Sequence, residues 1–232
     1  AVAASAARSE PMSATPSRRQ MCIRDRNYDE ALSKLEESLR IKERIGDNRV
    51  KTATLNQIAG VYVLQGKLDE ALSLFQQSLN LKEQIGDLKG QASTLNDIAG
   101  VYARQDRLQD AYQVYMQALQ ISERIGLPEE KASTLHNLAL HVYVPQHNYE
   151  QAANLYRQAL EIEEQVQNAY AKAKTMWRLA ELPIHSRAEL VTMLNNLNFS
   201  LEILQRMGSP EAKEIERVIL GLKEKIDSYG ID

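Results

Sequence analysis

The segment TLNQIAGVY at residues 54–62 returns as TLNDIAGVY at residues 94–102 and as TLHNLALHVY at residues 134–143. A second segment, ALSLFQQSLNLKEQIGD at residues 71–87, alternates with the first. Its other copies occupy residues 31–47, 111–126 and 152–167. Self-similarity at a fixed period of roughly 20–50 residues is typical of repeat architectures. The sequence therefore predicts an array of similar structural units.

Successive copies are separated by 40, 40 and then 41 residues, which indicates one residue inserted between Ala139 and Tyr149. Each period holds two amphipathic helices, because apolar residues recur at the i, i+3, i+4, i+7 spacing of a helix face. In the first helix of one repeat these residues are Leu55, Ile58, Ala59 and Tyr62. Glycines stand where a left-handed residue ends the second helix, and Asp47, Asp87 and Pro128 suit the start of the next one. These glycines are Gly46, Gly86 and Gly126. Short turns join the two helices of a pair, so the pairs are predicted to be antiparallel hairpins.

The alternation of large and small residues along each hairpin resembles the tetratricopeptide repeat. In one repeat the positions that carry the resemblance are Leu55, Ile58, Ala59, Tyr62, Gly66, Ala71, Phe75 and Ser78. Small residues are needed where two helices cross closely, because a larger side chain has no room there. The period is about six residues longer than that of the common repeat, and it resembles the repeats of kinesin light chains and of many bacterial signalling proteins. The resemblance implies an all-α fold, a right-handed superhelical solenoid of antiparallel helix pairs.

The array is expected to run over residues 27–208. Its parts are a half repeat at 27–46, repeats at about 48–86, 88–126 and 128–167, and a degenerate repeat at 168–208. Ser209 and Pro210 suit the first positions of a further helix, and the run that follows them is amphipathic. Its apolar face carries Ile215, Val218, Ile219, Leu222 and Ile226. Residues 209–228 are therefore predicted to form a C-terminal capping helix where the array meets water.

Residues 1–26 differ from the rest of the chain, because they are rich in Ala, Ser, Pro and Arg and show no apolar period. An Arg-rich and Ser-rich start resembles an organelle transit sequence, whereas the apolar stretch of a secretory signal is absent. The string Met21-Cys22-Ile23-Arg24-Asp25 is also what the transposon end of sequencing-library adapters encodes. We expect residues 1–26 to be disordered and adapter-derived, with the natural N-terminus missing.

Composition and motifs exclude several classes of function. The formal net charge of −3 offers no basic footprint for nucleic acid, and no apolar run reaches the roughly 18–20 residues that span a bilayer. His136 and His141 do not have the i, i+4 spacing of a metal pair, and a single cysteine excludes a thiolate cluster. The stretch from Gly60 to Lys67 imitates a phosphate loop with the wrong spacing. We therefore predict no enzyme activity, no cofactor, no metal site, and a cytoplasmic location by default.

The other ionisable groups are interpreted as surface residues. The four histidines, His136, His141, His147 and His185, suit turns or exposed positions better than a metal site. Three pairs of adjacent glutamates are interpreted as solvated helix faces, because neighbours on a helix point in different directions: Glu36–Glu37, Glu129–Glu130 and Glu163–Glu164.

The resemblance also implies where a ligand would bind. In that family the first helices of successive repeats line a concave groove that holds an extended peptide or a partner helix. Carried over by position, the groove residues are Asn56, Gly60, Asn96, Gly100, Arg104, His136, Leu140 and Trp177. The asparagines either hold a ligand backbone with their amides or merely suit a polar, half-exposed position. Gly60 and Gly100 indicate close packing or an open groove floor, and Trp177 is an aromatic anchor or filler against the last helices.

The leading hypothesis is a non-catalytic scaffold that binds a peptide or a partner protein in this groove. The alternative is a C-terminal sensor or regulatory fragment of a larger bacterial signalling protein whose effector domain lies upstream of residue 27. Neither hypothesis includes nucleic acid or a membrane as a partner. Self-association through the N-terminal helix is also expected, because the half repeat at 27–46 lacks its partner helix.

Overall fold

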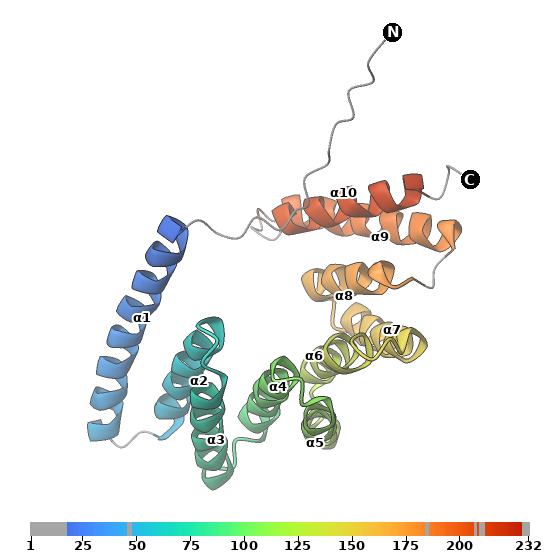
Figure 1. Cartoon of the computed structure of the whole chain (residues 1–232). Coiled ribbons are helices and arrows are strands. Elements are labelled where there is room, and N and C mark those ends of the chain that lie inside the picture. Colours follow the sequence, from blue (N-terminus) through green and yellow to red (C-terminus); the bar gives the residue numbers. More distant parts are fainter. Residues whose placement is uncertain (1–17, 46–47, 184–185, 207, 209–211, 229–232) are drawn as a thin grey trace.

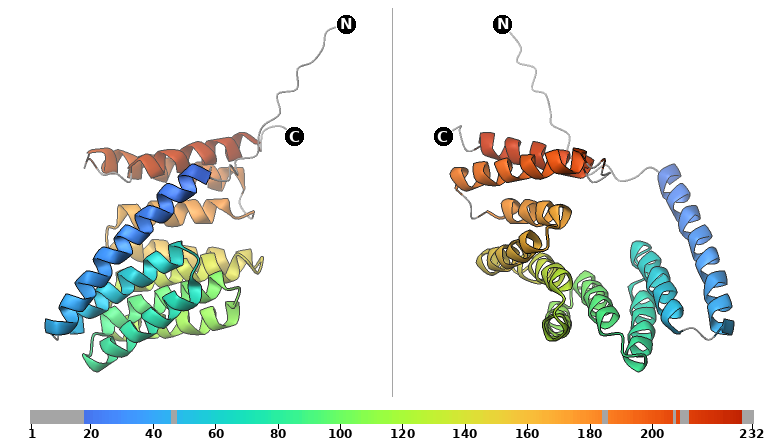
Figure 2. Two further views of the ribbon diagram at one scale, coloured as in Figure 1. Left: turned by 60° about the vertical axis from the view of Figure 1, so that its left-hand side comes forward. Right: turned by 180° about the vertical axis from the view of Figure 1, so that it is seen from behind.

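The computed structural model describes residues 18–45, 48–183, 186–206, 208 and 212–228. Within these ranges all regular elements are helical and no strand occurs. In chain order they are α1 (Arg18–Ile45), α2 (Asn48–Leu64), α3 (Leu68–Gln84), α4 (Leu88–Arg104), α5 (Leu108–Ile125), α6 (Pro128–Leu138), the π-helix η1 (Ala139–Tyr143), α7 (Tyr149–Gln165), α8 (Ala169–Glu181), α9 (Arg187–Arg206) and α10 (Ala212–Ser228). Figures 1 and 2 show these helices along an arc, with α1 at one end and α9 and α10 at the other. The chain is the right-handed superhelical solenoid of antiparallel helix pairs that its sequence predicts.

The helix ends follow the signals in the sequence. Asp87 is the N-cap of α4, and its Oδ1 accepts a hydrogen bond of 2.9 Å from the backbone N–H of Gly90. Gly126, with φ of +67°, ends α5 in the left-handed region that favours glycine, and Pro128 opens α6. Gly46 and Asp47 lie outside the described residues.

Small residues lie at the helix crossings, as the repeat pattern predicts. Ala59, Ala99 and Ala139 hold the same place in three successive first helices, and none of them is exposed. Tyr115 and Tyr156 are the large, fully buried counterparts on the second helices α5 and α7. The apolar core therefore continues from one repeat to the next instead of closing within each repeat.

The inserted residue is accommodated by a π-helical turn. Helix α6 ends at Leu138, and η1 takes up the extra residue before Tyr143 regains the position that Tyr102 holds one repeat earlier. Insertion of one residue is the usual origin of such turns, which often lie at functional sites. His141 belongs to this turn, on the side that faces the inside of the arc.

The N-terminal helix starts earlier than expected. The sequence predicts no structure before residue 27, whereas the backbone is helical from Arg18 onwards. Arg, Gln and Met are good helix formers, so the segment prolongs α1 by propensity although it carries no apolar stripe. Lys42 ties α1 to α2 through a hydrogen bond of 2.5 Å from Nζ to Thr54 Oγ1. Residues 1–17 lie outside the described part of the chain.

The C-terminal helices bury one continuous apolar cluster. Helix α9 is the second helix of the degenerate repeat, and Ser186 with Glu189 forms a capping box at its start. On α10 the predicted apolar stripe, including Ile215 and Leu222, is buried against α8 and α9. Lys225 of α10 donates hydrogen bonds to the carbonyl oxygens of Ala180 and Leu182 at the end of α8. No helix of the described chain has the length and apolar character needed to cross a membrane.

Candidate functional site

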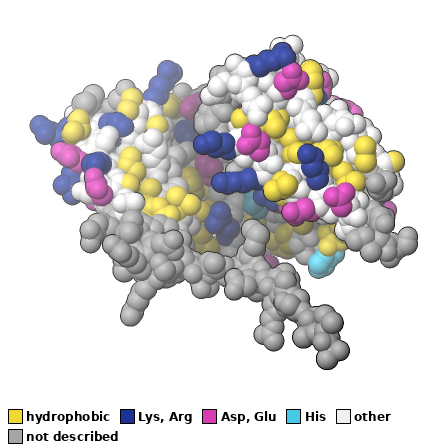
Figure 3. Space-filling view, turned by 90° about the horizontal axis from the view of Figure 1, so that it is seen from above, with side chains coloured by type: hydrophobic (Ala, Val, Ile, Leu, Met, Phe, Trp, Pro, Cys, Tyr) yellow, Lys and Arg dark blue, Asp and Glu magenta, His cyan; other side chains and the backbone are white. Residues whose placement is uncertain are grey.

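The inner side of the arc carries three depressions that share residues and form one groove. The first, of about 230 Å³, lies over α2, α4 and η1 and includes Gly60, Gly100, Arg104 and His141. A second lies between α4 and α6, and a third, of about 200 Å³, lies between α6 and α8. Asn96, Asp97 and Asn137 belong to the first two depressions, and Glu129, Ser133 and Asn137 belong to the last two. Figure 3 looks into this side of the molecule and shows the hollow with basic side chains around it.

Four of the predicted groove residues lie together in the first depression: Gly60, Asn96, Gly100 and Arg104. Leu140 does not join them, because its side chain packs against the core that α4, α5 and α7 share. Trp177 packs against α10, where a Cβ on Gly221 would lie 3.2 Å from its Cη2 atom. This contact fits the interpretation of Trp177 as filler against the last helices.

The two groove glycines are not required by packing. A Cβ atom on Gly60 would meet nothing within 4 Å, and one on Gly100 would only touch Tyr115 Oη at 3.8 Å. Both residues are in the middle of a helix and have ordinary helical backbone conformations. Of the two sequence interpretations, an open groove floor fits these positions and close packing does not.

The polar residues of one helical position link each repeat to the next. Asn56 Nδ2 donates to Thr94 Oγ1 at 3.1 Å, and Asn96 Nδ2 donates to Thr134 Oγ1 at 2.7 Å. One repeat later, His136 Nδ1 lies 2.8 Å from Thr175 Oγ1. The amide nitrogens are therefore engaged within the protein.

The opposite end of each of these side chains stays without a partner. Asn56 Oδ1, Asn96 Oδ1 and His136 Nε2 are buried atoms that have no hydrogen-bond partner among the described residues. A buried acceptor without a partner costs roughly 1–3 kcal/mol, so such groups need an explanation. The same repeat position therefore carries a buried polar atom without a partner in three successive repeats.

Thr94 and Thr175 also contact the second helix of the preceding repeat. Lys82 Nζ donates to Thr94 Oγ1 at 2.5 Å, and Thr175 donates to Glu163 Oε1 at 2.9 Å. Burial lowers the pKa of Lys82, and it raises the pKa of Glu163 to about 7. The interpretations of Glu163 as a solvated residue and of His136 as a surface residue are wrong, because only 3% and 4% of their surfaces are exposed.

Charges of both signs line the groove. Burial lowers the pKa of the His141 imidazole, and the positive charges of Arg104, Lys174 and Arg178 lower it further. Asp97 is reached by water but surrounded by the groove walls, and this desolvation raises its pKa to about 6 against the effect of Lys82. Among the described residues, the groove is therefore lined by two imidazoles, four carboxyl groups and two basic side chains: His136, His141, Asp97, Glu129, Glu130, Glu163, Arg104 and Lys174.

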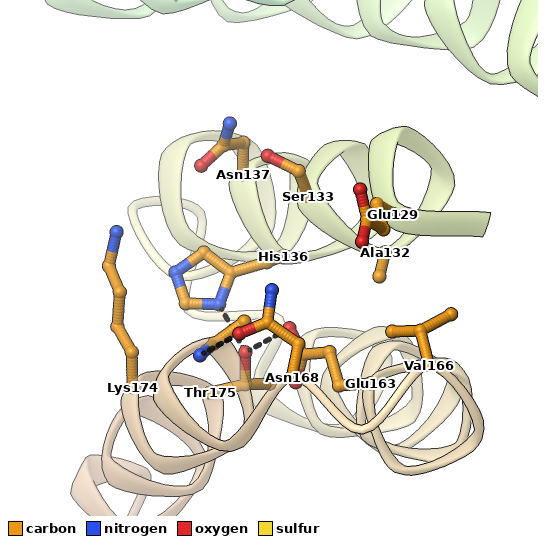
Figure 4. Close-up of a pocket in the computed structure, with 11 residues that line it drawn as sticks. Glu129, Ala132, Ser133, His136, Asn137, Glu163, Val166, Asn168, Lys174 and Thr175 are labelled. Atoms are coloured by element: carbon orange, nitrogen blue, oxygen red, sulfur yellow. Dashed lines mark hydrogen bonds between the residues drawn. The ribbon is translucent and has the colours of Figure 1, made fainter. Parts of the chain in front are cut away.

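Figure 4 shows the third depression, where α6, α7 and α8 meet. The carboxyl of Glu163 and the ring of His136 lie on either side of the Thr175 hydroxyl, and Lys174 lies beside the ring. The His136 ring also packs edge-on against Tyr156, with 5.4 Å between centroids. Burial, followed by the charges of Lys174 and Arg178, lowers the pKa of His136 to about 3, so this ring is neutral.

Several of these residues are absent from the sequence-based set: Asp97, Asn137, His141, Glu163, Lys174 and Thr175. Asp97 and Asn137 each follow a predicted residue directly, so the period itself could have identified them. His185 lies outside the described residues. No cluster of three or more His, Cys, Asp or Glu side chains suited to a metal ion occurs in the part of the chain that the structure describes. The arrangement offers hydrogen bonds and charges for binding.

Known structures with the same architecture cover most of the chain. BtubC from P. vanneervenii is 18% identical over 87% of this chain and 91% of its own, with a TM-score of 0.61. The STAND protein PH0952 from Pyrococcus horikoshii, which has a tetratricopeptide repeat sensor, is 15% identical over 90% of this chain and 34% of its own, with a TM-score of 0.62. The Rap conjugation regulator of plasmid pLS20, solved with the Phr* peptide, is 16% identical over 88% of this chain and 60% of its own, with a TM-score of 0.60. At these identities the likeness shows the fold alone.

No curated protein matches the sequence. A family model described as tetratricopeptide repeat matches residues 20–84 and 90–182, which is more than half of the chain. No catalytic family is indicated by these matches. The period, the small residues at the helix crossings and this match agree, and the chain belongs to the tetratricopeptide repeat family.

Proposed function

We propose that this protein is a non-catalytic interaction scaffold that binds an extended peptide, or a segment of a partner protein, in the groove between α2 and α8. The single observation that carries the proposal is the open floor at Gly60 and Gly100. A glycine inside a helix costs roughly 0.5–1 kcal/mol relative to alanine, and neither position needs glycine for packing. A backbone that approaches the floor closely would explain why both positions lack a side chain.

The groove offers a bound chain complementary groups along its length. Oδ1 of Asn56 and Oδ1 of Asn96 are unpartnered acceptors that could receive backbone N–H groups. Each Nδ2 already donates one hydrogen bond to a threonine, so Oδ1 is the fully unpartnered atom of each asparagine and would receive a donor of the ligand. Arg104 is exposed and would supply a planar donor pair for a carboxylate of the ligand. The Rap regulator solved with the Phr* peptide supports a peptide ligand by its fold.

A peptide-display screen on the full chain, followed by titration of the selected peptide, tests this proposal. Arg104→Ala and Gly100→Ala should each weaken binding at least several-fold. Gln76→Ala and Gln117→Ala are matched controls, because both side chains are exposed on the second helices α3 and α5. Stronger losses in the two controls than in the two groove variants would move the binding face to the convex side and refute the proposal.

A second candidate is a regulatory or sensor segment of a longer signalling protein in the cytoplasm. The observation that favours it is the match to PH0952, in which an array of this shape accounts for 34% of a longer chain. The genomic reading frame upstream of Asn27 tests this candidate. An ATPase or DNA-binding domain in that frame would support it, and a stop codon close to residue 27 would refute it.

A further inference from the structure

The threonine contact between α7 and α8 joins a carboxylic acid to an imidazole. Thr175 Oγ1 lies 2.9 Å from Glu163 Oε1 and 2.8 Å from His136 Nδ1 (Figure 4). Both ionisable side chains are more than nine-tenths buried. The remaining polar atoms of the pair, Glu163 Oε2 and His136 Nε2, have no partner among the described residues. The three side chains therefore form a linear chain of hydrogen bonds, and the atom at each end of it has no partner among the described residues.

Because the Thr175 hydroxyl has a single proton, it donates to only one of its two neighbours at a time. This fixes the direction of both hydrogen bonds. When Glu163 is ionised, its oxygens only accept hydrogen bonds, so Thr175 donates to Oε1. Thr175 then accepts from His136, which places the ring proton on Nδ1 and leaves Nε2 as an acceptor. When Glu163 carries a proton on Oε1, it donates to Thr175, and Thr175 donates to Nδ1. The ring proton is then on Nε2, which becomes a donor.

The surroundings of His136 keep its ring neutral in both tautomers. Burial, together with Lys174 and Arg178 on α8 and His141 on η1, lowers the pKa of His136. Burial raises the pKa of Glu163 to about 7, while the hydrogen bond from Thr175 and the charge of Lys174 oppose the rise. Across neutral pH the carboxyl therefore takes up one proton, and the imidazole changes its tautomer without changing its charge.

The depression between α6 and α8 has room for a ligand group, with a volume of about 200 Å³. Its charged lining consists of Glu129 on α6, Glu163 on α7 and Lys174 on α8. The two carboxyl groups disfavour an anion and the lysine disfavours a cation. A neutral group that both donates and accepts hydrogen bonds, such as an amide, suits this lining best.

We propose that this depression is an amide-binding subsite of the groove in which the protonation of Glu163 controls His136. Through the Thr175 hydroxyl, it determines whether His136 Nε2 accepts from the amide N–H or donates to the amide carbonyl. The proposal rests on the proposed function, because it takes the groove as the binding face. In the ionised form, Nε2 continues the row of acceptors begun by Asn56 Oδ1 and Asn96 Oδ1. In the protonated form, this row ends in a donor.

Nitrogen-15 NMR of the His136 ring in the free, full chain tests the coupling without any ligand. As the pH falls from 8 to 6, the proton should move from Nδ1 to Nε2, with the ring neutral throughout. Thr175→Val and Glu163→Gln should both abolish this change, and circular dichroism checks that each variant remains helical. His136→Asn, which places the residue of positions 56 and 96 here, identifies the His136 signals by their loss. An unchanged tautomer, or a ring that becomes cationic near pH 7, would overturn the proposal.

Titration with acetamide, acetate and methylammonium at pH 8 tests the subsite. Acetamide should shift the Nε2 signal of His136 at concentrations at least several-fold lower than the two ions, and His136→Asn should remove its binding. Equal or tighter binding of acetate or methylammonium overturns the subsite. Failure of peptide binding with acetamide binding intact would instead refute the proposed function, so the two failures are distinguishable.

Discussion

Lys82 and Glu163 occupy the same position in two different repeats, and each contacts the threonine twelve residues further along the chain. Both side chains are buried, with 6% and 3% of their surface exposed. The shared partner explains how one position holds a cation in one repeat and an acid in another. A threonine hydroxyl accepts a hydrogen bond from the ammonium group and donates one to the carboxyl group. The same buried position of the repeat can therefore hold a basic side chain in one repeat and an acidic one in another.

Thr94→Val tests how much such a threonine contributes to stability. The hydroxyl of Thr94 accepts from both Lys82 Nζ and Asn56 Nδ2, and valine would leave two buried donors without an acceptor. We expect the free energy of unfolding in urea to fall by about 1–3 kcal/mol. Thr192→Val on the exposed face of α9 is the matched control and should be nearly silent. An equally small effect at both positions would contradict the structural role of the threonine.

Ala99→Leu tests the helix crossings. Ala99 has no exposed surface and packs in the core that α4 and α5 share, so the added atoms would overpack it. Thermal or urea denaturation should show a loss of about 1–3 kcal/mol. Ala53→Leu on α2, where the side chain is exposed, provides the control and should cost much less.

Gly100→Ala should stabilise the protein while it weakens ligand binding. The new Cβ would meet only Tyr115 Oη at 3.8 Å, and alanine is favoured in a helix by roughly 0.5–1 kcal/mol. Gly221→Ala is the contrasting variant, because its Cβ would approach Trp177 Cη2 to 3.2 Å and the gain should be lost. Urea titration and peptide titration of the same samples measure both effects. Destabilisation by Gly100→Ala would show that packing requires this glycine.

Glu163→Gln should change how stability depends on pH. The folded-state pKa of Glu163 is raised from 4.5 to about 7, so between these values the folded state binds more protons than the unfolded state. The stabilisation of the wild type is therefore complete below about pH 4.5 and is lost as the pH rises through about 7. Glutamine keeps the acceptor for Thr175 but cannot titrate.

Urea midpoints at pH 5, 6, 7 and 8 measure this difference. Relative to Glu163→Gln, the wild type should lose about 2–3 kcal/mol across the range, since each pKa unit corresponds to about 1.4 kcal/mol. Asp97→Asn serves as a second comparison, because desolvation by the groove walls also raises the pKa of Asp97, to about 6. Parallel profiles for wild type and Glu163→Gln would refute the raised pKa.

The fold could be predicted from the sequence because the information for it is repeated. Ala99 and Tyr102 recur at a fixed distance from Ala59 and Tyr62, and burial of such residues requires the same helix crossing in each repeat. The start of α1 at Arg18 could not be predicted in this way. A helix that continues by propensity leaves no apolar period in the sequence.

The groove could be predicted only in part. Repeat position identifies the inward side of α4, and Asn96, Gly100 and Arg104 indeed line one depression. The partner of Asn96 is Thr134, which lies in the next repeat, and a contact between polar residues of two repeats leaves no hydrophobic pattern. Glu163 has the sequence surroundings of a solvated residue, whereas the three-dimensional structure shows that it is buried. Comparison of Lys82 with Glu163 across the period is the signal that would have identified it.

An extra residue in an α-helix turns everything after it by about 100° around the helix axis, since a turn takes 3.6 residues. The turn of η1 at Ala139–Tyr143 absorbs this rotation within one repeat. The repeats before it are interchangeable modules of 40 residues, which duplication or recombination could multiply without a change of phase. The repeat that contains η1 is not interchangeable in this sense, because a splice through it would misalign the helix that follows. This one turn therefore marks where the array can be lengthened freely and where its order is fixed.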